Sequence, residues 1–289
     1  MRSAMGYHKR LQKLEAARLA VNRNLKGSTI APSDVTAALT SIGIERGSMV
    51  LVHADAIVAA QFPAVHPAMA DDERLDLLIG AIEAAIGTDG TLVIPAFSYS
   101  FTKGEVFDVL RTPSAVGMVS ERFRIQQGVC RTSDPIFSFA CRGRLASELC
   151  ALPVNECFGA ESVFGFLHRR NAHIVDLGCS MSRGGTFVHY VETAHGVDYR
   201  YRKEFSGTVI YPSGQRAEHS VVYNVRDLTR RSDADLRRLQ RRLADDGKSR
   251  TANLGRSRVM AVTAGDLFAT AWRMLDEDPV ALIAEGSRE

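Results

Sequence analysis

The stretch Met49-Val50-Leu51-Val52-His53-Ala54-Asp55 decides the fold, because an unbroken apolar run that ends in a polar turn is typical of a buried strand. Thr91-Leu92-Val93-Ile94-Pro95 has the same character, and a helical pattern at residues 72–86 separates the two runs. A third such run, Ile174-Val175-Asp176-Leu177-Gly178, comes later in the chain. Strands that alternate with helices predict an α/β fold with a mixed, mostly parallel central sheet flanked by helices.

Further elements follow from caps and turns. A helix is expected from the Pro32/Ser33 cap to about Ile42, and another from the Thr112 cap, with Pro113 at its first position. Residues 208–211 and 219–223 predict a β-hairpin around Pro212-Ser213-Gly214. The chain should end with helices at residues 233–245, capped by Ser232, and at residues 264–276. We expect an N-terminal helical extension over residues 1–30 and a single domain over residues 31–289.

Composition favours a cytoplasmic enzyme. No apolar run is long enough to span a bilayer, and the basic N-terminus lacks the apolar segment of a signal peptide. The formal net charge of +3 argues against nucleic-acid binding by the chain as a whole. The odd number of cysteines, five, and the absence of C-x-x-C spacing predict reduced thiols and no zinc site.

The strongest candidate for chemistry lies in Gly184-Gly185-Thr186-Phe187-Val188-His189-Tyr190-Val191-Glu192. If Thr186 is an N-cap, His189 falls in the first helical turn and shares one helix face with Glu192. The electropositive helix N-terminus disfavours a protonated imidazole, which suits a general base, and Glu192 could orient the ring. The alternative is an ordinary surface histidine paired with a glutamate.

A series of motifs in a fixed order supports the catalytic interpretation. Together with the stretches quoted above, they are Phe97-Ser98-Tyr99, Phe107-Asp108, Pro113-Ser114-Ala115-Val116-Gly117, Glu121-Arg122-Phe123-Arg124, residues 131–140, and Phe158-Gly159-Ala160-Glu161-Ser162-Val163-Phe164. From about Ser33 to about Leu282, the chain resembles the aminoglycoside 3-N-acetyltransferase family. These are coenzyme-A-dependent enzymes, distinct from the GNAT acetyltransferases.

The resemblance implies acetyl-CoA as co-substrate and no metal. It places the thioester or pantetheine arm at the turn after the first strand, formed by His53, Ala54, Asp55, Ala56 and Ile57. A satisfied core histidine is an equal alternative for His53. The resemblance also suggests a phosphate contact at Arg131, Thr132 and Ser133, with a further hydroxyl from Ser138. Asp134, where the family often has histidine, brings negative charge to this segment.

The implied reaction is direct attack of a substrate amine on the thioester, with His189 removing a proton and backbone N–H groups stabilising the oxyanion. A ping-pong route through Cys179 is an alternative, although a small cysteine at a strand end is more often simply packed there.

The acceptor is predicted from a basic and aromatic segment that follows the dyad. Tyr199, Arg200 and Arg202 suit an anionic or nucleotide-linked amino sugar, since tyrosines stack and arginines bind phosphate. An aminoglycoside acceptor and a solvated basic strand are the alternatives. We expect Phe97, Tyr99 and Glu161 to contact the acceptor as well, although Glu161-Ser162 could merely cap a helix.

Two other classes of protein use the same residues. A metal-dependent hydrolase could employ His53, Asp55, His189 and Glu192, but no H-E-x-x-H spacing supports it. A non-catalytic binding protein could keep the fold.

The arginine-rich C-terminal segment is a solvated helix surface or, less simply, a nucleic-acid stripe. We expect a small-molecule amine as substrate, no nucleic acid, no membrane insertion, and a chain able to form a homodimer.

Overall fold

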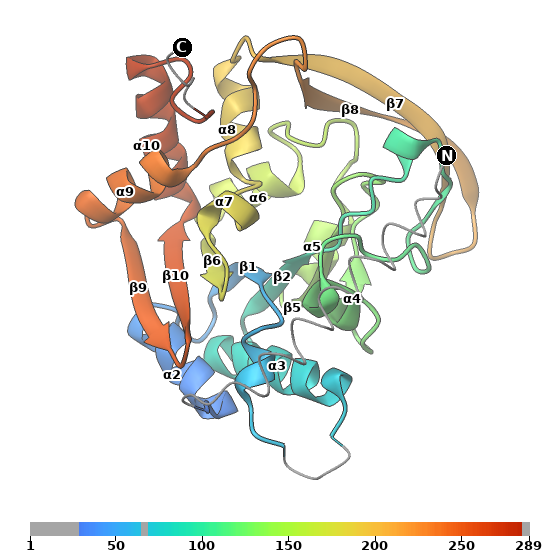
Figure 1. Ribbon diagram of the computed structural model, residues 1–289. Helices are drawn as coiled ribbons and strands as arrows, with labels where there is room; N and C mark the ends of the chain where they lie inside the picture. Colours follow the sequence, from blue (N-terminus) through green and yellow to red (C-terminus); the bar gives the residue numbers. More distant parts are fainter. Residues whose placement is uncertain (1–28, 65–68, 285–289) are drawn as a thin grey trace.

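The computed structural model describes residues 29–64 and 69–284 (Figure 1). The predicted helical extension over residues 1–30 lies almost entirely outside this part and stays a prediction. A seven-stranded sheet has the order β4-β5-β2-β1-β6-β10-β9. At its centre β1 (Met49–Ala54) pairs in parallel with β2 (Thr91–Pro95) and with β6 (His173–Leu177).

The outer strands join by antiparallel pairing. On one side lie β5 (Phe139–Gly143) and the short β4 (Cys130–Arg131), and on the other lie β10 (Ser257–Thr263) and β9 (Ser249–Leu254). The mixed α/β class is therefore confirmed. Within this sheet, parallel pairing is confined to the three central strands, so the sheet is less parallel than its apolar runs led us to expect.

The central strands are buried on both faces. Val50 and Val52 point into the core beneath one helical layer, whereas Leu51 points into the core on the opposite face. This alternation places His53 on the same face as Leu51, and the pairing of His53 with Asp176 of β6 places the two side chains side by side.

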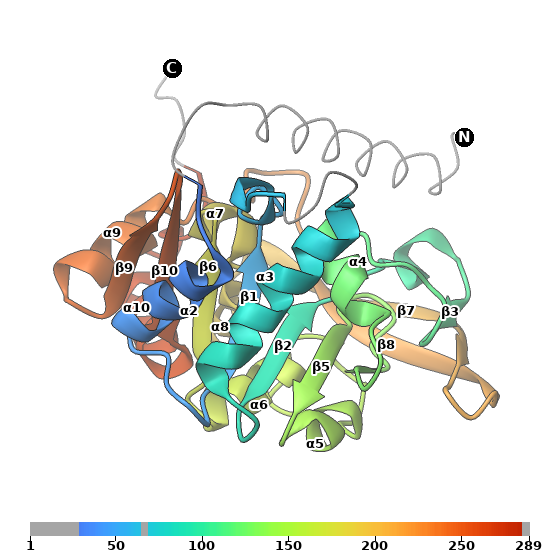
Figure 2. The same cartoon turned by 90° about the horizontal axis from the view of Figure 1, so that it is seen from below.

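One face of the sheet is covered by α2 (Pro32–Ser41), α3 (Asp71–Ile86) and α4 (Met118–Arg124), as Figure 2 shows. The first two helices are confirmed to within a residue or two. The helix expected from Thr112 and Pro113 is wrong, because α4 begins only at Met118, after Gly117 at a φ of 122°. The Thr112 hydroxyl instead accepts the N–H of Asp108, which closes a turn.

The other helices belong to the opposite face and its surroundings. They are α5 (Ala146–Cys150), α6 (Val163–Arg169), α7 (Met181–Gly184), α8 (Val188–His195), α9 (Arg237–Asp245) and α10 (Ala264–Glu277). The final helix is confirmed within a residue. The predicted Ser232 cap is wrong, since that hydroxyl donates to the carbonyl of Asp227 and α9 begins only at Arg237.

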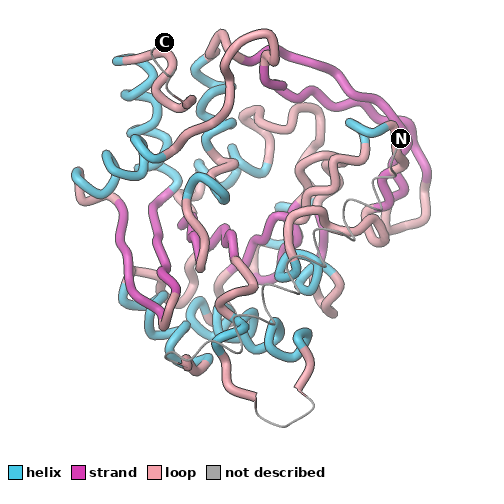
Figure 3. The backbone as a smooth tube through the Cα atoms, viewed as in Figure 1, coloured by secondary structure: helices cyan, strands magenta, loops and turns pink. Residues whose placement is uncertain are grey.

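A second sheet contains the predicted hairpin, whose strands are longer than expected. β7 (Arg200–Ile210) and β8 (Arg216–Arg226) form a long curved ribbon, and β3 (Phe107–Asp108) pairs with β7 (Figure 3). Two short 3₁₀ turns, η1 (Ala59–Gln61) and η2 (Phe101–Lys103), follow β1 and β2. The start of β7 lies next to α8, which brings the hairpin to the proposed dyad.

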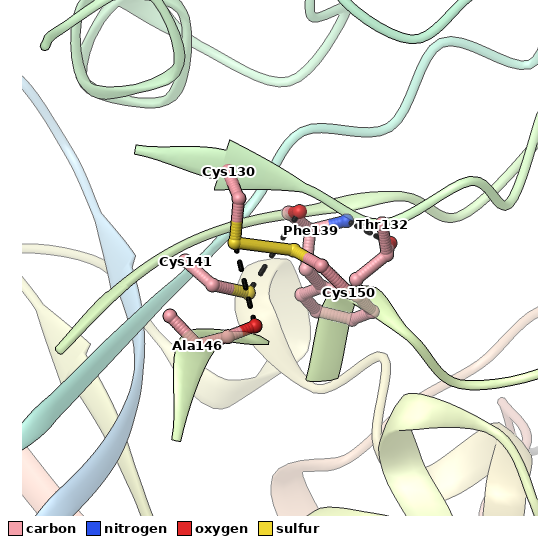
Figure 4. Close-up of a disulfide and its surroundings, with 6 residues drawn as sticks. All are labelled: Cys130, Thr132, Phe139, Cys141, Ala146 and Cys150. Carbon is pink, nitrogen blue, oxygen red and sulfur yellow. Dashed lines mark hydrogen bonds between the residues drawn. A yellow bond between two sulfur atoms is a disulfide. The ribbon is translucent and has the colours of Figure 1, made fainter. Parts of the chain in front are cut away.

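The expectation that all cysteines are reduced is wrong. Cys130 of β4 and Cys150 of α5 form a disulfide, with their Cα atoms 6.6 Å apart (Figure 4). Cys141, Cys157 and Cys179 remain reduced. Twenty residues separate the bonded pair in sequence, and only the antiparallel return of β5 brings α5 back to β4.

Within residues 29–64 and 69–284, no helix is long and apolar enough to cross a membrane.

Candidate active site

The site lies where the three parallel strands end. A cavity of about 180 Å³ opens at the carboxyl ends of β1, β2 and β6, where open α/β sheets commonly bind ligands. Its wall includes the segment after β6 that leads through α7 to α8. This segment therefore connects one wall of the cavity with the predicted dyad.

The dyad is present in the form that the helical spacing predicts. Nδ1 of His189 lies 2.6 Å from Oε2 of Glu192, one turn further along α8. The His189 side chain is 20% exposed, whereas that of Glu192 is fully buried. A carboxylate on Nδ1 favours the tautomer with a proton there, which leaves Nε2 as the nitrogen able to accept one.

Glu192 is held by two further groups from the start of β7. The Tyr199 hydroxyl donates to Oε1 at 2.8 Å, and Nε of Arg200 lies 2.6 Å from Oε2. Burial raises the pKa of Glu192, but the charges of His189 and Arg200, with hydrogen bonds from His189 and Tyr199, outweigh it and lower the pKa below its ordinary value. Glu192 is thus a carboxylate suited to orienting His189 and balancing its charge.

The predicted Thr186 cap is wrong. Helix α8 begins at Val188, and Phe187 occupies the cap position without a side-chain hydrogen bond. Thr186 lines the cavity instead, and its carbonyl accepts the N–H of His189 at 3.1 Å. His189 still falls in the first turn, as expected, and this turn connects it to the cavity.

Five residues predicted for the site line the cavity: His53, Ala54, Asp55, Phe97 and Tyr99. Tyr99 has a φ of 57°, in the left-handed region that few residues other than glycine adopt. Burial, followed by the influence of Tyr223, raises its pKa to about 12, so its hydroxyl is a hydrogen-bond donor at neutral pH.

Aromatic contacts continue from the cavity to the dyad. Tyr99 packs edge-on against Phe137 at 5.7 Å between ring centroids, and Phe137 contacts Phe158 at 4.7 Å. Phe158 in turn contacts the His189 ring at 5.5 Å. These ring contacts lead from the wall of the cavity to the dyad and give His189 an apolar neighbour in Phe158.

The turn after β1 offers fewer backbone donors than expected. The N–H of Asp55 donates to the Leu177 carbonyl at 2.9 Å, and that of Ile57 donates to the Asp55 carboxylate at 3.0 Å. Of these three amides, only that of Ala56 has no hydrogen-bond acceptor within the described part of the chain. The turn therefore supplies at most one amide to a ligand in this conformation.

The predicted phosphate cluster is largely used inside the protein. The buried Arg131 guanidinium donates to the Ser138 hydroxyl and to the carbonyls of Ala96, Thr112 and Val109. The Thr132 hydroxyl accepts the Phe139 N–H, and Ser138 itself is fully buried. Arg131, Thr132 and Ser138 brace β4, β5 and the loop after β2, a role that burial favours over phosphate binding.

Ser133 and the remaining acceptor candidates are placed differently. Ser133 lines a separate cavity of about 660 Å³ beside the disulfide. Glu161 is exposed and pairs with Arg169 at 3.6 Å, while Ser162 caps α6 by accepting the N–H of Gly165. Arg202 is exposed and pairs with Glu156.

Direct contact with an acceptor would require Tyr199 and Arg200 to be exposed, but both are buried. Their side chains are buried against Glu192, and only 2% of the Arg200 side chain is accessible. Both belong to the layer that supports the dyad, so burial argues against the direct acceptor contact that we expected.

Sequence reasoning missed Asp176 of β6, whose carboxylate lies 3.3 Å from Nδ1 of His53. A charged residue within an apolar strand was the available signal.

Among the described residues, no three His, Cys, Asp or Glu side chains are grouped to hold a metal ion. This applies to the set His53, Asp55, His189 and Glu192 considered for a hydrolase.

An imidazole held by a buried carboxylate near the carboxyl ends of parallel strands is an arrangement that general-base catalysis uses. The sequence profile of the aminoglycoside 3-N-acetyltransferase family matches residues 51–276. The chain belongs to this family, as its motifs predict. It is an acyl-CoA-dependent N-acyltransferase with acetyl-CoA as co-substrate.

Individual relatives agree with this assignment. Aminoglycoside N(3)-acetyltransferase IV from Salmonella sp is 27% identical over 255 residues, which cover 87% of this chain and 89% of that protein. The apoenzyme of aminoglycoside acetyltransferase AAC(3)-IVa has a TM-score of 0.71 at 22% identity, covering 90% of this chain and 93% of its own. The structure of AAC(3)-Xa has a TM-score of 0.73 at 17% identity, covering 92% of this chain and 98% of its own. These structures confirm the fold.

Proposed function

We propose that the enzyme acetylates an amino group of an aminoglycoside-type acceptor, with His189 as general base and Glu192 as its orienting carboxylate. The observation that carries this proposal is the 2.6 Å contact between Nδ1 of His189 and the buried Glu192. The partly exposed imidazole can reach a substrate, whereas the carboxylate behind it cannot.

In the proposed reaction, Nε2 of His189 removes a proton from the acceptor amine as its nitrogen attacks the thioester carbonyl carbon. Glu192 balances the positive charge that then develops on the ring, and Tyr199 and Arg200 keep the carboxylate in place. The C–S bond of the resulting tetrahedral intermediate breaks, giving the N-acetyl product and free CoA. General-base catalysis of this kind contributes a rate factor of about 10²–10⁴.

We assign the thioester end of acetyl-CoA to the 180 Å³ cavity, whose wall carries both polar groups and the Phe97 ring. Two observations support this assignment. The cavity lies at the carboxyl ends of the parallel strands, and Thr186 joins its wall to the turn that bears His189. A related enzyme, AAC-IIIb, has been solved with CoASH bound.

The acceptor is better matched by an aminoglycoside than by an anionic amino sugar. The case for an anionic acceptor rested on Tyr199, Arg200 and Arg202, but two of these hold Glu192 and the third pairs with Glu156. The related AAC(3)-IVa has been solved with a gentamicin and with apramycin, in a variant that carries a histidine-to-alanine substitution. A cytoplasmic location and a homodimer stay predictions.

A direct test compares acceptors by the rate at which free CoA is released from acetyl-CoA. The panel contains gentamicin, apramycin and a nucleotide-linked amino sugar. We expect kcat/KM to be at least about tenfold higher for an aminoglycoside, because discrimination of this size needs only one or two contacts. A preference for the nucleotide sugar would favour the anionic acceptor, and no transfer to any amine would refute the proposed function.

A further inference from the structure

A second histidine–carboxylate pair lies beside the cavity, in addition to the dyad. His53 of β1 and Asp176 of β6 occupy paired positions on adjacent parallel strands, and Nδ1 of His53 lies 3.3 Å from Oδ1 of Asp176. Their side chains are 9% and 3% exposed. His53 lines the cavity, so the pair connects the sheet interior with the space where we place the thioester.

The pair is buried without the hydrogen bonds that such groups normally require. Among the residues that the structure describes, Nδ1 and Nε2 of His53 and Oδ1 of Asp176 have no hydrogen-bond partner, although Nδ1 and Oδ1 are within ion-pair distance. Leaving a buried polar group unsatisfied costs about 1–3 kcal/mol. A cluster of such atoms beside a cavity therefore indicates groups that act on a ligand.

The backbone of α7 is shaped to accommodate the pair. A Cβ atom on Gly184 would lie 2.4 Å from Oδ1 of Asp176 and 2.8 Å from Cβ of His53, so only glycine fits this close approach. The same glycine begins the short turn that leads through Thr186 to His189. Both histidine–carboxylate pairs are thus positioned by one segment of chain, on the same face of the sheet.

The two pairs suit opposite ends of the same reaction. His189 is expected to receive the proton of the amine, but the departing sulfur of CoA also needs a proton. Nδ1 of His53 faces Asp176, whose carboxylate supplies compensating charge for a ring that carries a proton. Nε2, the ring nitrogen that does not face Asp176, has no partner and is then the one that would donate to a group bound in the cavity that His53 lines.

We propose that His53 is the general acid that protonates the leaving sulfur of CoA, with Asp176 as its positioning residue. The inference rests on the proposed acetyl transfer. As the C–S bond of the tetrahedral intermediate breaks, its electron pair goes to sulfur, and the proton on Nε2 of His53 moves to it. The products are the amide and the CoA thiol. His189 then releases its proton to solvent, and His53 regains one from solvent.

The test uses two acyl donors that differ in one atom, acetyl-CoA and acetyl-seleno-CoA. A selenol is much more acidic than a thiol, so selenium leaves without protonation. We expect His53→Gln to lower the single-turnover rate with acetyl-CoA about 10²-fold, but with the selenoester by no more than about threefold. Asp176→Asn should show the same dependence on the donor with a smaller loss.

Controls separate this role from a structural one. His189→Gln should slow both donors equally, because it acts on the amine. Thermal unfolding and CoA titration establish that each variant is folded. An equal loss with both donors in His53→Gln, or no loss with acetyl-CoA, would overturn the inference while leaving the proposed function intact. Failure of the wild-type enzyme to acetylate any amine would refute the proposed function, and this inference with it.

Discussion

At the scale of single residues, Glu192 is the group on which the geometry of the dyad depends. A fully buried carboxylate is costly unless it is paired and hydrogen bonded, and here His189, Tyr199 and Arg200 converge on its two oxygens. The helical spacing alone predicted the contact with His189. It could not predict Tyr199 and Arg200 as partners, because nothing local to that segment indicates that it packs against α8.

Replacement of Tyr199 by phenylalanine removes one hydrogen bond and leaves the ring in place. Because the acceptor is a buried carboxylate, we expect Tyr199→Phe to lower the free energy of unfolding by about 1–3 kcal/mol. It should also lower kcat, since Glu192 would hold His189 less firmly. Urea unfolding and steady-state kinetics measure the two effects. Tyr201→Phe, at an exposed ring, is the matched control, and equal behaviour of the two variants would contradict this assignment.

The lowered pKa of Glu192 predicts a pH-dependent contribution to stability. A carboxyl with a lower pKa in the folded state than in the unfolded state stabilises the fold above the unfolded value, about 4.3, and loses this effect as the pH falls through the folded value. The stability difference between wild type and Glu192→Gln should therefore be largest near neutral pH and shrink in acid. Unfolding measured from neutral to acidic pH tests this, with the exposed Glu161→Gln as control. A stability difference between the two proteins that grows as the pH falls would contradict a lowered pKa for Glu192 in the folded state.

At the scale of elements, local sequence patterns predicted helices and strands well where one type of residue dominates a segment. The apolar runs located β1, β2 and β6, and the periodicity of α3 was correct to within a residue. The start of α9 was wrong because the Ser232 hydroxyl has a backbone acceptor in the preceding turn. Strand β9 escaped notice because it is a polar edge strand, with most of its side chains partly or fully exposed.

The disulfide is the feature of the elements that sequence reasoning most clearly missed. It joins β4 to α5 across 20 residues, and it lines the same cavity as Ser133. Disulfides are uncommon in reducing compartments, so this pair weakens the argument for a cytoplasmic location that rested on reduced thiols. The disulfide could not be predicted from the spacing of the cysteines, because antiparallel strand pairing, not proximity in sequence, brings them together.

Breaking this disulfide should destabilise the protein. Loop-closure entropy for about 20 residues corresponds to about 3 kcal/mol. We expect a reducing agent to lower the urea midpoint of the wild-type protein accordingly. A variant with both Cys130→Ser and Cys150→Ser should not respond to the reducing agent. An unchanged wild-type midpoint would mean that the bond contributes nothing to stability.

At the scale of the whole molecule, the site is assembled from segments far apart in the chain. The ends of β1, β2 and β6 form the cavity, α8 supplies the dyad, and the start of β7 supports it. Motif order was sufficient to predict the family, the fold class and the dyad. It placed Arg131 and Thr132 at a phosphate site because residue type alone does not show whether a guanidinium is already bound within the protein, as here by Ser138 and several carbonyls.

The rate of acetyl transfer by His189→Gln tests most directly whether His189 is the general base. Glutamine keeps approximate size and polarity but cannot accept the proton, so we expect kcat to fall about 10²–10⁴-fold while calorimetric binding of acetyl-CoA is retained. That result would identify His189 as the base. A variant that binds acetyl-CoA and acetylates the acceptor at the wild-type rate would contradict the account.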